Sequence, residues 1–502
     1  MKKYYLLLLI IVMTSCGGNT SLQPASSFLL TSSGNNLYVL SQQWGIVTKI
    51  DMTSLSLTTY SVGAGANMVL PYSPMYNSLF TGTSTSMPPS GGVAVLNPSQ
   101  DTVYLIGKEV VKKTIADNLN DMVIAPDGTH AVVFHNYIPG EEASFSGILV
   151  FNTFSIVNLT TTTDDTVTLS IGGGAPQEVV FTPSGDKFIV ISNNRCFVVP
   201  TASPSNSHYI ELWPDPSIIV VPDQVVITPQ GDIALIRSYA QNAVYAVNLL
   251  VPSIMNVFTE NQPTSISIYP DGNIGLIVDQ GSDSVSILSF DHTSTTVSEI
   301  PVSLTTPASA AATSFSCTGG MCTVSDTTYS ALIYAPSSSS ESITYLKIKN
   351  GITSTTVYGG LIAPVQSILF APDEPSKAII LHSASNLPNA AYPVSLINVD
   401  TQDVNPFYIK EAPSSVIFAR NQGGDDVLLM TLNSQSELIY YDLASGVSGF
   451  LTIPPVPDTM GISNNTLFIS HDQPLGFITL LDINSFTMRF VSGFNVYKLF
   501  DR

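Results

Sequence analysis

The residues of this 502-residue chain that are most suited to chemistry are histidines at equivalent positions of different repeats. Three of them directly follow the second strand of a predicted repeat, namely His135, His382 and His471. Other repeats carry different polar residues at this position, namely Ser192, Ser238 and Asp279. The series predicts a polar lining at a channel or its mouth, with a metal site as one alternative and solvent-facing strand ends as the other. Because the histidine-bearing repeats are not all neighbours, we expect no metal and no cofactor.

Motifs of common catalytic centres do not occur in the sequence. There is no Gly-x-Ser-x-Gly elbow, which argues against a hydrolase triad, and no Cys-x-x-Cys-His for haem attachment. Gly172-Gly173-Gly174 precedes no helical pattern, so we expect a loop there and no phosphate cradle. Calcium at Asp164-Asp165 or Asp425-Asp426 is a lesser alternative, since neither pair belongs to an ordered series of ligands. We therefore expect no catalytic residues and a protein that is not an enzyme.

Four cysteines divide into three groups. Cys317 and Cys322 flank a Thr-Gly-Gly-Met turn, and in an oxidising compartment a disulfide across this hairpin is the favoured prediction. A zinc site would need a second pair of ligands. Cys196 lies in an apolar strand and is expected to be a buried free thiol. Cys16 belongs to the N-terminal segment.

Residues 1–15 have the pattern of a bacterial signal peptide. Lys2-Lys3 precede the apolar run Tyr4–Met13, which is too short to span a bilayer. The run leads into Met13-Thr14-Ser15-Cys16, which resembles a lipobox. The resemblance implies cleavage before Cys16 and its acylation, for example with palmitate; a signal peptide cut near Ser15 or beyond is the alternative.

Residues 16–27 are small and polar after the cysteine, which is typical of a flexible tether. Gly17 lacks the aspartate signal that retains some lipoproteins in the inner membrane, so the resemblance favours an outer-membrane lipoprotein, facing the periplasm or the surface. The predicted membrane contact is the acylated Cys16.

Charge and composition narrow the choice of partners. The net charge is −20, with 17 basic and 37 acidic residues, which argues against nucleic acid and favours solubility. Charged residues make up only 11% of the chain, far below the usual quarter. Strands rich in Ser and Thr with frequent turns are what we expect of an exported all-β protein.

A recurring strand–turn–strand unit must position all of these residues. The unit is an apolar strand, a turn led by proline and a second apolar strand, with copies at Val123–Gly128, Val180–Gly185, Val226–Gly231, Ser267–Gly272 and, imperfectly, Leu369–Glu374. Proline presets φ early in the turn, and glycine closes it or takes a left-handed conformation. Two further strands follow each hairpin, so four strands form a repeat, as in a propeller blade.

Weaker turns bring the total to about eight to ten repeats within residues 28–502. The turns fall near residues 33, 74, 126, 183, 229, 270, 319, 372, 420 and 464. Because propellers usually have four to eight blades, some weak turns can be insertions; a single ring is favoured and two rings are the alternative. Thr305–Phe315 is the best candidate for a linker, although a loop leading into a strand fits as well.

The repeat resembles the YVTN-type propeller repeat, a relative of WD-repeat blades. Its third strand, which often ends in Asp, matches Ile46–Asp51 and Phe477–Asp482. The resemblance implies an all-β propeller of four-stranded antiparallel blades, whereas its members differ widely in function. From the predicted anchor, the repeats and the absence of a catalytic motif, we expect a non-enzymatic scaffold that binds a protein partner at the bacterial envelope. The rival is a lactonase-like or redox-like propeller enzyme that acts on a small exported metabolite.

Overall fold

The computed structural model describes residues 29–72, 92–136, 152–172, 174–192, 194–213, 220–259, 261–317, 326–336, 338–383, 391–473 and 475–494. The predicted signal peptide, Cys16, the tether and Cys322 lie outside these residues. In the described residues the regular structure is β-strand, with two short 3-10 turns, η1 (Pro98–Gln100) and η3 (Pro204–Asn206), and no α-helix. The prediction of an all-β protein is therefore confirmed.

Ten four-stranded antiparallel sheets follow one another along the chain, each made of four consecutive strands. Ten blades of this kind make a β-propeller, which confirms the predicted fold and the upper end of the predicted repeat number. The chain divides into two compact units. The first four and the last two blades form a six-blade unit, and Ile210–Ala412 holds the other four.

The strands of the six-blade unit, blade by blade, are β1 (Leu29–Ser33), β2 (Asn36–Ser41), β3 (Ile46–Asp51), β4 (Leu57–Ser61); β5 (Met68–Pro71), β6 (Val93–Asn97), β7 (Thr102–Ile106), β8 (Val110–Thr114); β9 (Asp121–Ile124), β10 (His130–Phe134), β11 (Thr153–Asn158), β12 (Val167–Ser170); β13 (Glu178–Phe181), β14 (Lys187–Ser192), β15 (Arg195–Pro200), β16 (His208–Glu211); β33 (Ser415–Arg420), β34 (Asp426–Leu432), β35 (Glu437–Asp442), β36 (Ser448–Thr452); β37 (Pro457–Ser463), β38 (Thr466–His471), β39 (Phe477–Asp482) and β40 (Met488–Ser492). We number these blades 1–4, 9 and 10.

The strands of the four-blade unit, blades 5–8, are β17 (Gln224–Ile227), β18 (Ile233–Ser238), β19 (Ala243–Asn248), β20 (Ser253–Thr259); β21 (Pro263–Ile268), β22 (Ile274–Asp279), β23 (Ser284–Asp291), β24 (Thr296–Ser303); β25 (Ala310–Cys317), β26 (Thr327–Tyr334), β27 (Ile343–Lys349), β28 (Ile352–Tyr358); β29 (Val365–Phe370), β30 (Lys377–His382), β31 (Tyr392–Asn398) and β32 (Asp403–Ile409). Most of Thr305–Phe315, the candidate linker, is thus the first strand of blade 7 and the loop before it.

Each predicted turn separates the first and second strands of a blade. The turns near residues 74 and 319 fall in undescribed residues, but the strands on either side of them pair as neighbours. Gly272 has a φ of 75°, the left-handed conformation that the Pro-Asp-Gly motif predicts. The third strands at Ile46–Asp51 and Phe477–Asp482 have the predicted bounds.

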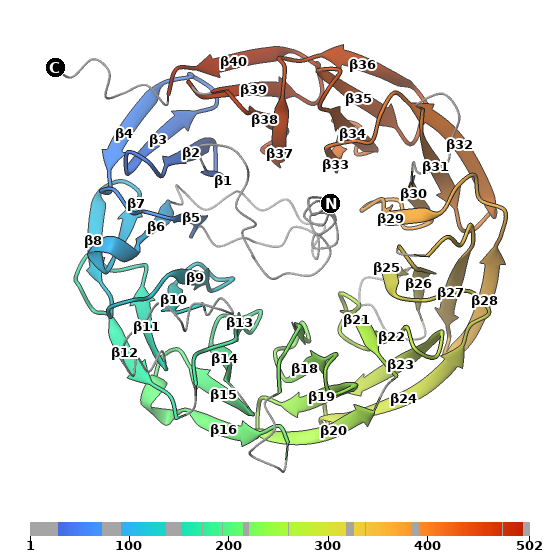
Figure 1. The fold of residues 1–502 in the computed structure, drawn as a ribbon, viewed down its shortest axis with the longest axis horizontal. Helices are drawn as coiled ribbons and strands as arrows, with labels where there is room; N and C mark the ends of the chain where they lie inside the picture. Colours follow the sequence, from blue (N-terminus) through green and yellow to red (C-terminus); the bar gives the residue numbers. More distant parts are fainter. Residues whose placement is uncertain are drawn as a thin grey trace, which may run out of the picture. The chain divides into compact units, whose positions relative to one another are not determined.

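The burial of a strand follows its place in the blade. Second strands such as β22 are buried along their whole length, since both faces of the sheet meet a neighbouring blade, and their sequences are nearly continuous apolar runs. Fourth strands such as β28 consist mostly of exposed and partly buried residues. Within each unit the first strands of successive blades lie next to one another, and the blades fan out toward their fourth strands (Figure 1).

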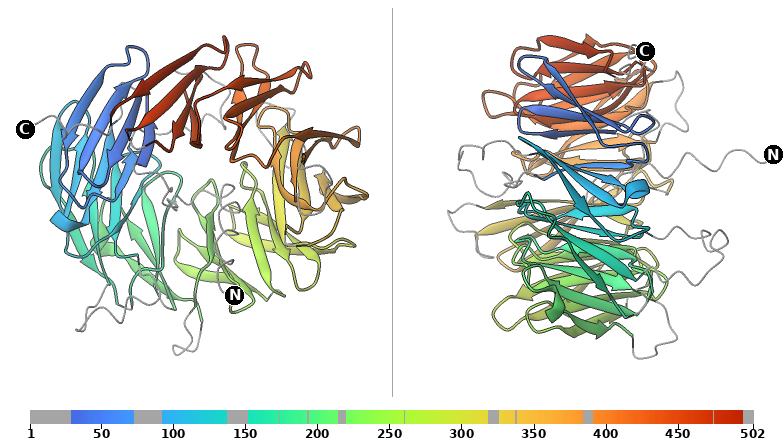
Figure 2. Two further views of the ribbon diagram at one scale, coloured as in Figure 1. Left: turned by 45° about the horizontal axis from the view of Figure 1, so that its top comes forward. Right: turned by 90° about the vertical axis from the view of Figure 1, so that its left-hand side faces the viewer.

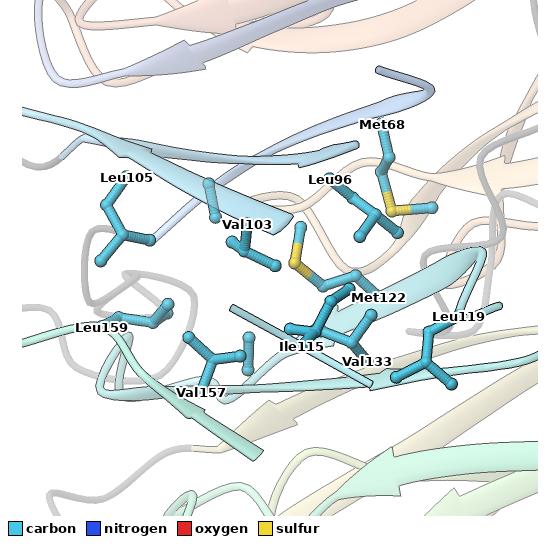
Figure 3. Packing of buried hydrophobic residues seen from close by; sticks show 12 residues of the cluster. Met68, Leu96, Val103, Leu105, Ile115, Leu119, Met122, Val133, Val157 and Leu159 are labelled. Atoms are coloured by element: carbon cyan, nitrogen blue, oxygen red, sulfur yellow. The ribbon is translucent and has the colours of Figure 1, made fainter. Parts of the chain in front are cut away.

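The hydrophobic core is a series of layers between adjacent blades. Figure 3 shows the layer between blades 2 and 3, where Met68 and Leu96 from one blade face Met122 and Val133 from the other. Comparable layers join the other neighbouring blades of each unit. Rigid support for the loops therefore comes from repeated sheet-on-sheet packing.

The first and last blades of the chain pack against each other in the six-blade unit. Leu37 and Ile50 of blade 1 share a core cluster with Ile478 and Leu480 of blade 10. The Ser463 hydroxyl also donates a hydrogen bond of 2.8 Å to the Gly34 carbonyl. Figures 1 and 2 show the β1–β4 and β37–β40 sheets side by side.

Candidate functional site

The polar residues predicted to follow the second strands form one structural series, in which all except His135 are the last residue of the strand itself. Five of the six predicted members hydrogen-bond a backbone carbonyl of the loop that precedes the first strand of their own blade. The pairs are Ser192 with Gly174 (2.7 Å), Ser238 with Val221 (2.8 Å), His135 with Asn118 (2.7 Å), His382 with Ala363 (2.8 Å) and His471 with Pro455 (3.3 Å). In blade 2, Asn97 bonds the Val62 carbonyl in the same way at 2.7 Å. The shared function of the series is to fasten each loop to its blade.

Two histidines of this series have both ring nitrogens engaged. Nε2 of His382 lies 2.8 Å from the Ser395 hydroxyl, and Nε2 of His471 lies 2.8 Å from the Thr479 hydroxyl. Because Nδ1 faces a carbonyl, it carries the proton, and Nε2 accepts the hydroxyl hydrogen. Burial lowers the pKa of His382 and of His471, and outweighs the opposite effect of the carbonyls. Both rings are therefore neutral hydrogen-bonding groups.

The structure corrects the expectation that these strand ends face solvent or line a channel mouth. His382, His471, Ser192, Ser238 and Asp279 are fully buried, and His135 is 5% exposed. They are buried because the second strand lies inside the sheet of its blade, between the first and third strands. Among the described residues, no group of three or more His, Cys, Asp or Glu side chains is arranged to hold a metal ion.

The acidic pairs considered for calcium bind protein groups. Asp165 accepts a 2.6 Å hydrogen bond from the ammonium of Lys113, whose side chain is fully buried. Asp164 accepts the backbone N–H of Thr114. Asp425 accepts from the Asn421 side chain, and Asp426 is 1% exposed at the start of β34. The first pair thus joins blade 3 to the fourth strand of blade 2, and a buried cation already lies beside it.

A pair of carboxyl groups that sequence reasoning missed lies on neighbouring first strands. Asp121 is the first residue of β9 and Glu178 is the first residue of β13, and these two strands are adjacent. Asp121 accepts hydrogen bonds of 2.7 Å from the Asn136 side chain and from the Met122 N–H. Both acids stand five residues before a turn proline, Pro126 or Pro183, and this common offset is the signal that could have identified them.

Burial and mutual repulsion favour a proton on this pair. Burial, and then the charge of Asp121, raise the pKa of Glu178 to about 7. Burial also raises the pKa of Asp121, against the lowering effect of its two hydrogen bonds. Near neutral pH the pair thus offers a proton donor beside a carboxylate, an arrangement that can exchange a proton with a ligand or bind a cationic group.

The remaining cysteine predictions have different outcomes. Cys196 is a fully buried free thiol, as predicted, and burial raises its pKa to about 12. Cys317 ends β25 at the position where the hairpin turn begins. Because Cys322 lies outside the described residues, the Cys317–Cys322 disulfide stays a prediction, and so does acylation of Cys16.

Comparisons with known proteins leave the family open. No protein-family model matches the chain, and no curated protein does. A structure of a eukaryotic initiation factor is 10% identical, with 93% of this chain and 96% of that chain covered and a TM-score of 0.49. The dihydro-heme d1 dehydrogenase NirN is 12% identical, with 77% and 78% covered and a TM-score of 0.43. The Dos1 propeller is 10% identical, with 62% and 82% covered and a TM-score of 0.43.

These likenesses carry no ligand, activity or partner over to this chain. The assignment as a propeller rests on the ten four-stranded sheets of the chain itself. In the described part of the chain no helix has the length and apolar character needed to cross a bilayer.

Proposed function

We propose that this chain is a lipoprotein of the bacterial envelope whose propeller acts as a rigid binding or assembly scaffold. Acyl chains on Cys16 hold it at a membrane, with the outer membrane favoured, and loops at the ends of the blades receive a protein partner. The observation that carries the proposal is the series of buried polar side chains at the ends of the second strands. Members such as His382 and Ser192 hydrogen-bond the backbone of a loop. These recurring polar groups stabilise a rigid scaffold, on which the sequences of the loops can vary.

Acylation is tested by metabolic labelling with a palmitate analogue. Wild type is expected to take up the label and to fractionate with the envelope, whereas Cys16→Ser takes up none, because the acyl acceptor is gone. Purified Cys16→Ser protein with an unchanged far-UV spectrum shows that the fold is intact. An unlabelled wild type with a mature N-terminus beyond Cys16 would reject the anchor.

The scaffold role is tested by crosslinking in intact cells followed by purification of the chain. One envelope protein recovered in stoichiometric amounts with wild type is the expected result. Recovery of no partner at any crosslinker length would contradict the scaffold role, whether or not the chain is acylated.

A second candidate function is an enzyme that acts on a small exported metabolite, and the Asp121–Glu178 pair favours it. A protonated carboxyl group beside a carboxylate is a common arrangement for general acid–base catalysis. Turnover in a screen of lactones and small esters, lost in Glu178→Gln with the fold intact, would establish this candidate. Equal rates for wild type and Glu178→Gln would remove the pair from consideration.

A further inference from the structure

Three exposed apolar side chains occupy loops of the neighbouring blades 1 and 10. Trp44 is 41% exposed in the turn between β2 and β3, and Leu475 is 58% exposed between β38 and β39. Val456, directly before β37, is 42% exposed and has a φ of 58°. Positive φ is costly for a β-branched residue. The Asp472 N–H, which bonds the Val456 carbonyl at 2.9 Å, helps to hold this conformation.

All three side chains lie at one end of the two blades. In blade 1, Leu29 pairs with Leu40, so the β2–β3 turn is at the end where β1 begins. In blade 10, Pro457 pairs with His471, so Val456 and the β38–β39 turn are at the end where β37 begins. The opposite ends of the two blades meet through Ser463 and the Gly34 carbonyl. Since the blades lie side by side in one orientation, the ends that carry Trp44, Val456 and Leu475 also coincide.

The two ends of these blades differ in whether they expose large apolar side chains. Among the described residues of the apolar end (42–45, 453–456, 472–473 and 475–476), Asp472 is the single charged residue, in a chain of net charge −20. The turns at the opposite end are polar and expose Thr53, Ser54, Asn464, Asn465 and Asn484. Leu55 and Phe486 in these polar turns are partly buried and pack against the core.

The chain runs toward its predicted anchor from the apolar end. Leu29, the first residue of β1, lies there, and Cys16 is 13 residues upstream. Thirteen residues span at most about 45 Å when fully extended. A chain of small polar residues has a root-mean-square span of about 20 Å. An acylated Cys16 therefore keeps this end of blades 1 and 10 close to the bilayer, at a high effective concentration.

We propose that Trp44, Val456 and Leu475 form a surface that rests on the lipid bilayer. The inference depends on the lipid anchor proposed above and adds an orientation to it. Tryptophan prefers the membrane–water interface, where its ring contacts acyl chains and its N–H remains hydrated. A few apolar side chains bind a bilayer weakly by themselves, so the tether and the surface act together as two signals. Zwitterionic lipid is the expected partner, because a chain of net charge −20 is repelled by anionic headgroups.

The test couples the chain from Cys16 onward, through the Cys16 thiol, to a maleimide lipid in phosphatidylcholine vesicles. Mass spectrometry verifies that Cys16 is the coupled residue; Cys196 is buried. Trp213→Phe leaves Trp44 as the single tryptophan of the chain. Vesicles with brominated acyl chains then quench Trp44 if it enters the interface. The matched control is Val447→Trp with both native tryptophans replaced by Phe, because Val447 is 57% exposed near the β35–β36 turn of blade 9, at the polar end.

Brominated lipid is expected to reduce Trp44 fluorescence by about half and to leave the control unchanged, as interfacial insertion of one end requires. Leu475→Asp should weaken the quenching of Trp44, since a charge then enters the contact. Absent quenching of Trp44, or equal quenching of Trp44 and the control, would overturn the proposal. A crosslink between Trp44 and an envelope protein would not rescue it. Because the lipid is coupled chemically, the result does not depend on acylation in cells. Absence of the palmitate label would reject the lipoprotein, whereas absence of quenching would reject the lipid-contacting surface.

Discussion

Gly272 is the position where a small change tests the repeat most directly. Its φ is 75°, and a β-carbon there would lie 2.0 Å from Oε1 of Gln230 in the preceding blade. Nε2 of Gln230 donates a 2.8 Å hydrogen bond to the Asp271 carbonyl. Gly272→Ala therefore has two costs, a left-handed backbone for an L-residue and displacement of the Gln230 side chain.

The two costs can be estimated separately. The left-handed conformation costs about 1–2 kcal/mol for a residue with a β-carbon. Loss of the Gln230 hydrogen bond costs about 0.5–1.5 kcal/mol. Gly272→Ala should therefore lower the free energy of unfolding by roughly 1.5–3.5 kcal/mol. Gly351 is a matched control, because its φ is 71° and no atom lies within 4 Å of its β-carbon position. Gly351→Ala should show the backbone cost alone.

A double-mutant cycle with Gln230→Ala measures the contact term. Urea midpoints at unchanged m-value give the free energies. In the Gln230→Ala background, Gly272→Ala should cost about as much as Gly351→Ala does in wild type, since the obstructing side chain is gone. An equal cost of Gly272→Ala in both backgrounds would refute the role of the neighbouring blade. A neutral Gly351→Ala would refute the backbone argument.

Three further outcomes follow from the buried polar groups and cysteines. His382→Ala should destabilise by about 2–3 kcal/mol, because it leaves the Ala363 carbonyl and the Ser395 hydroxyl without their partner; urea unfolding checks this, and an unchanged midpoint would contradict it. Because the pKa of Glu178 is about 7 when folded and lower when unfolded, its contribution to stability is complete below about pH 4.5 and is lost as pH rises through 7. Glu178→Gln should remove this part of the pH dependence in thermal melts, and the same slope in both proteins would argue against it. Unreduced peptide mapping should find Cys317 linked to Cys322, and two free thiols in envelope-extracted protein would exclude the link.

Local turn chemistry explains why the repeats could be predicted from the sequence. Proline and glycine constrain φ whatever surrounds them, so the turn at Gly272 was predictable. The apolar strands flanking such turns placed Ile46–Asp51 and Phe477–Asp482 at their observed bounds. Cys196 was predictable as buried because its strand is apolar after Arg195.

Contacts between residues that are far apart in the sequence could not be predicted in this way. His382 and His471 look like polar strand ends in sequence, and their burial depends on the place of the second strand inside the packed blade. Asp121 and Glu178 are 57 residues apart, and only the register between adjacent first strands brings them together. Trp44 and Leu475 are more than 400 residues apart, and the packing of blade 1 on blade 10 decides that they share one end.

That packing has a consequence for the order in which the protein matures. Blade 1 is synthesised early, but the residues that cover its Leu37 and Ile50 side chains, Ile478 and Leu480, are synthesised much later. Until then one apolar sheet face has no cover, at a stage when such faces promote aggregation. Truncation after blade 9 would make this exposure permanent. We therefore expect a slow final folding step that depends on the synthesis of blade 10.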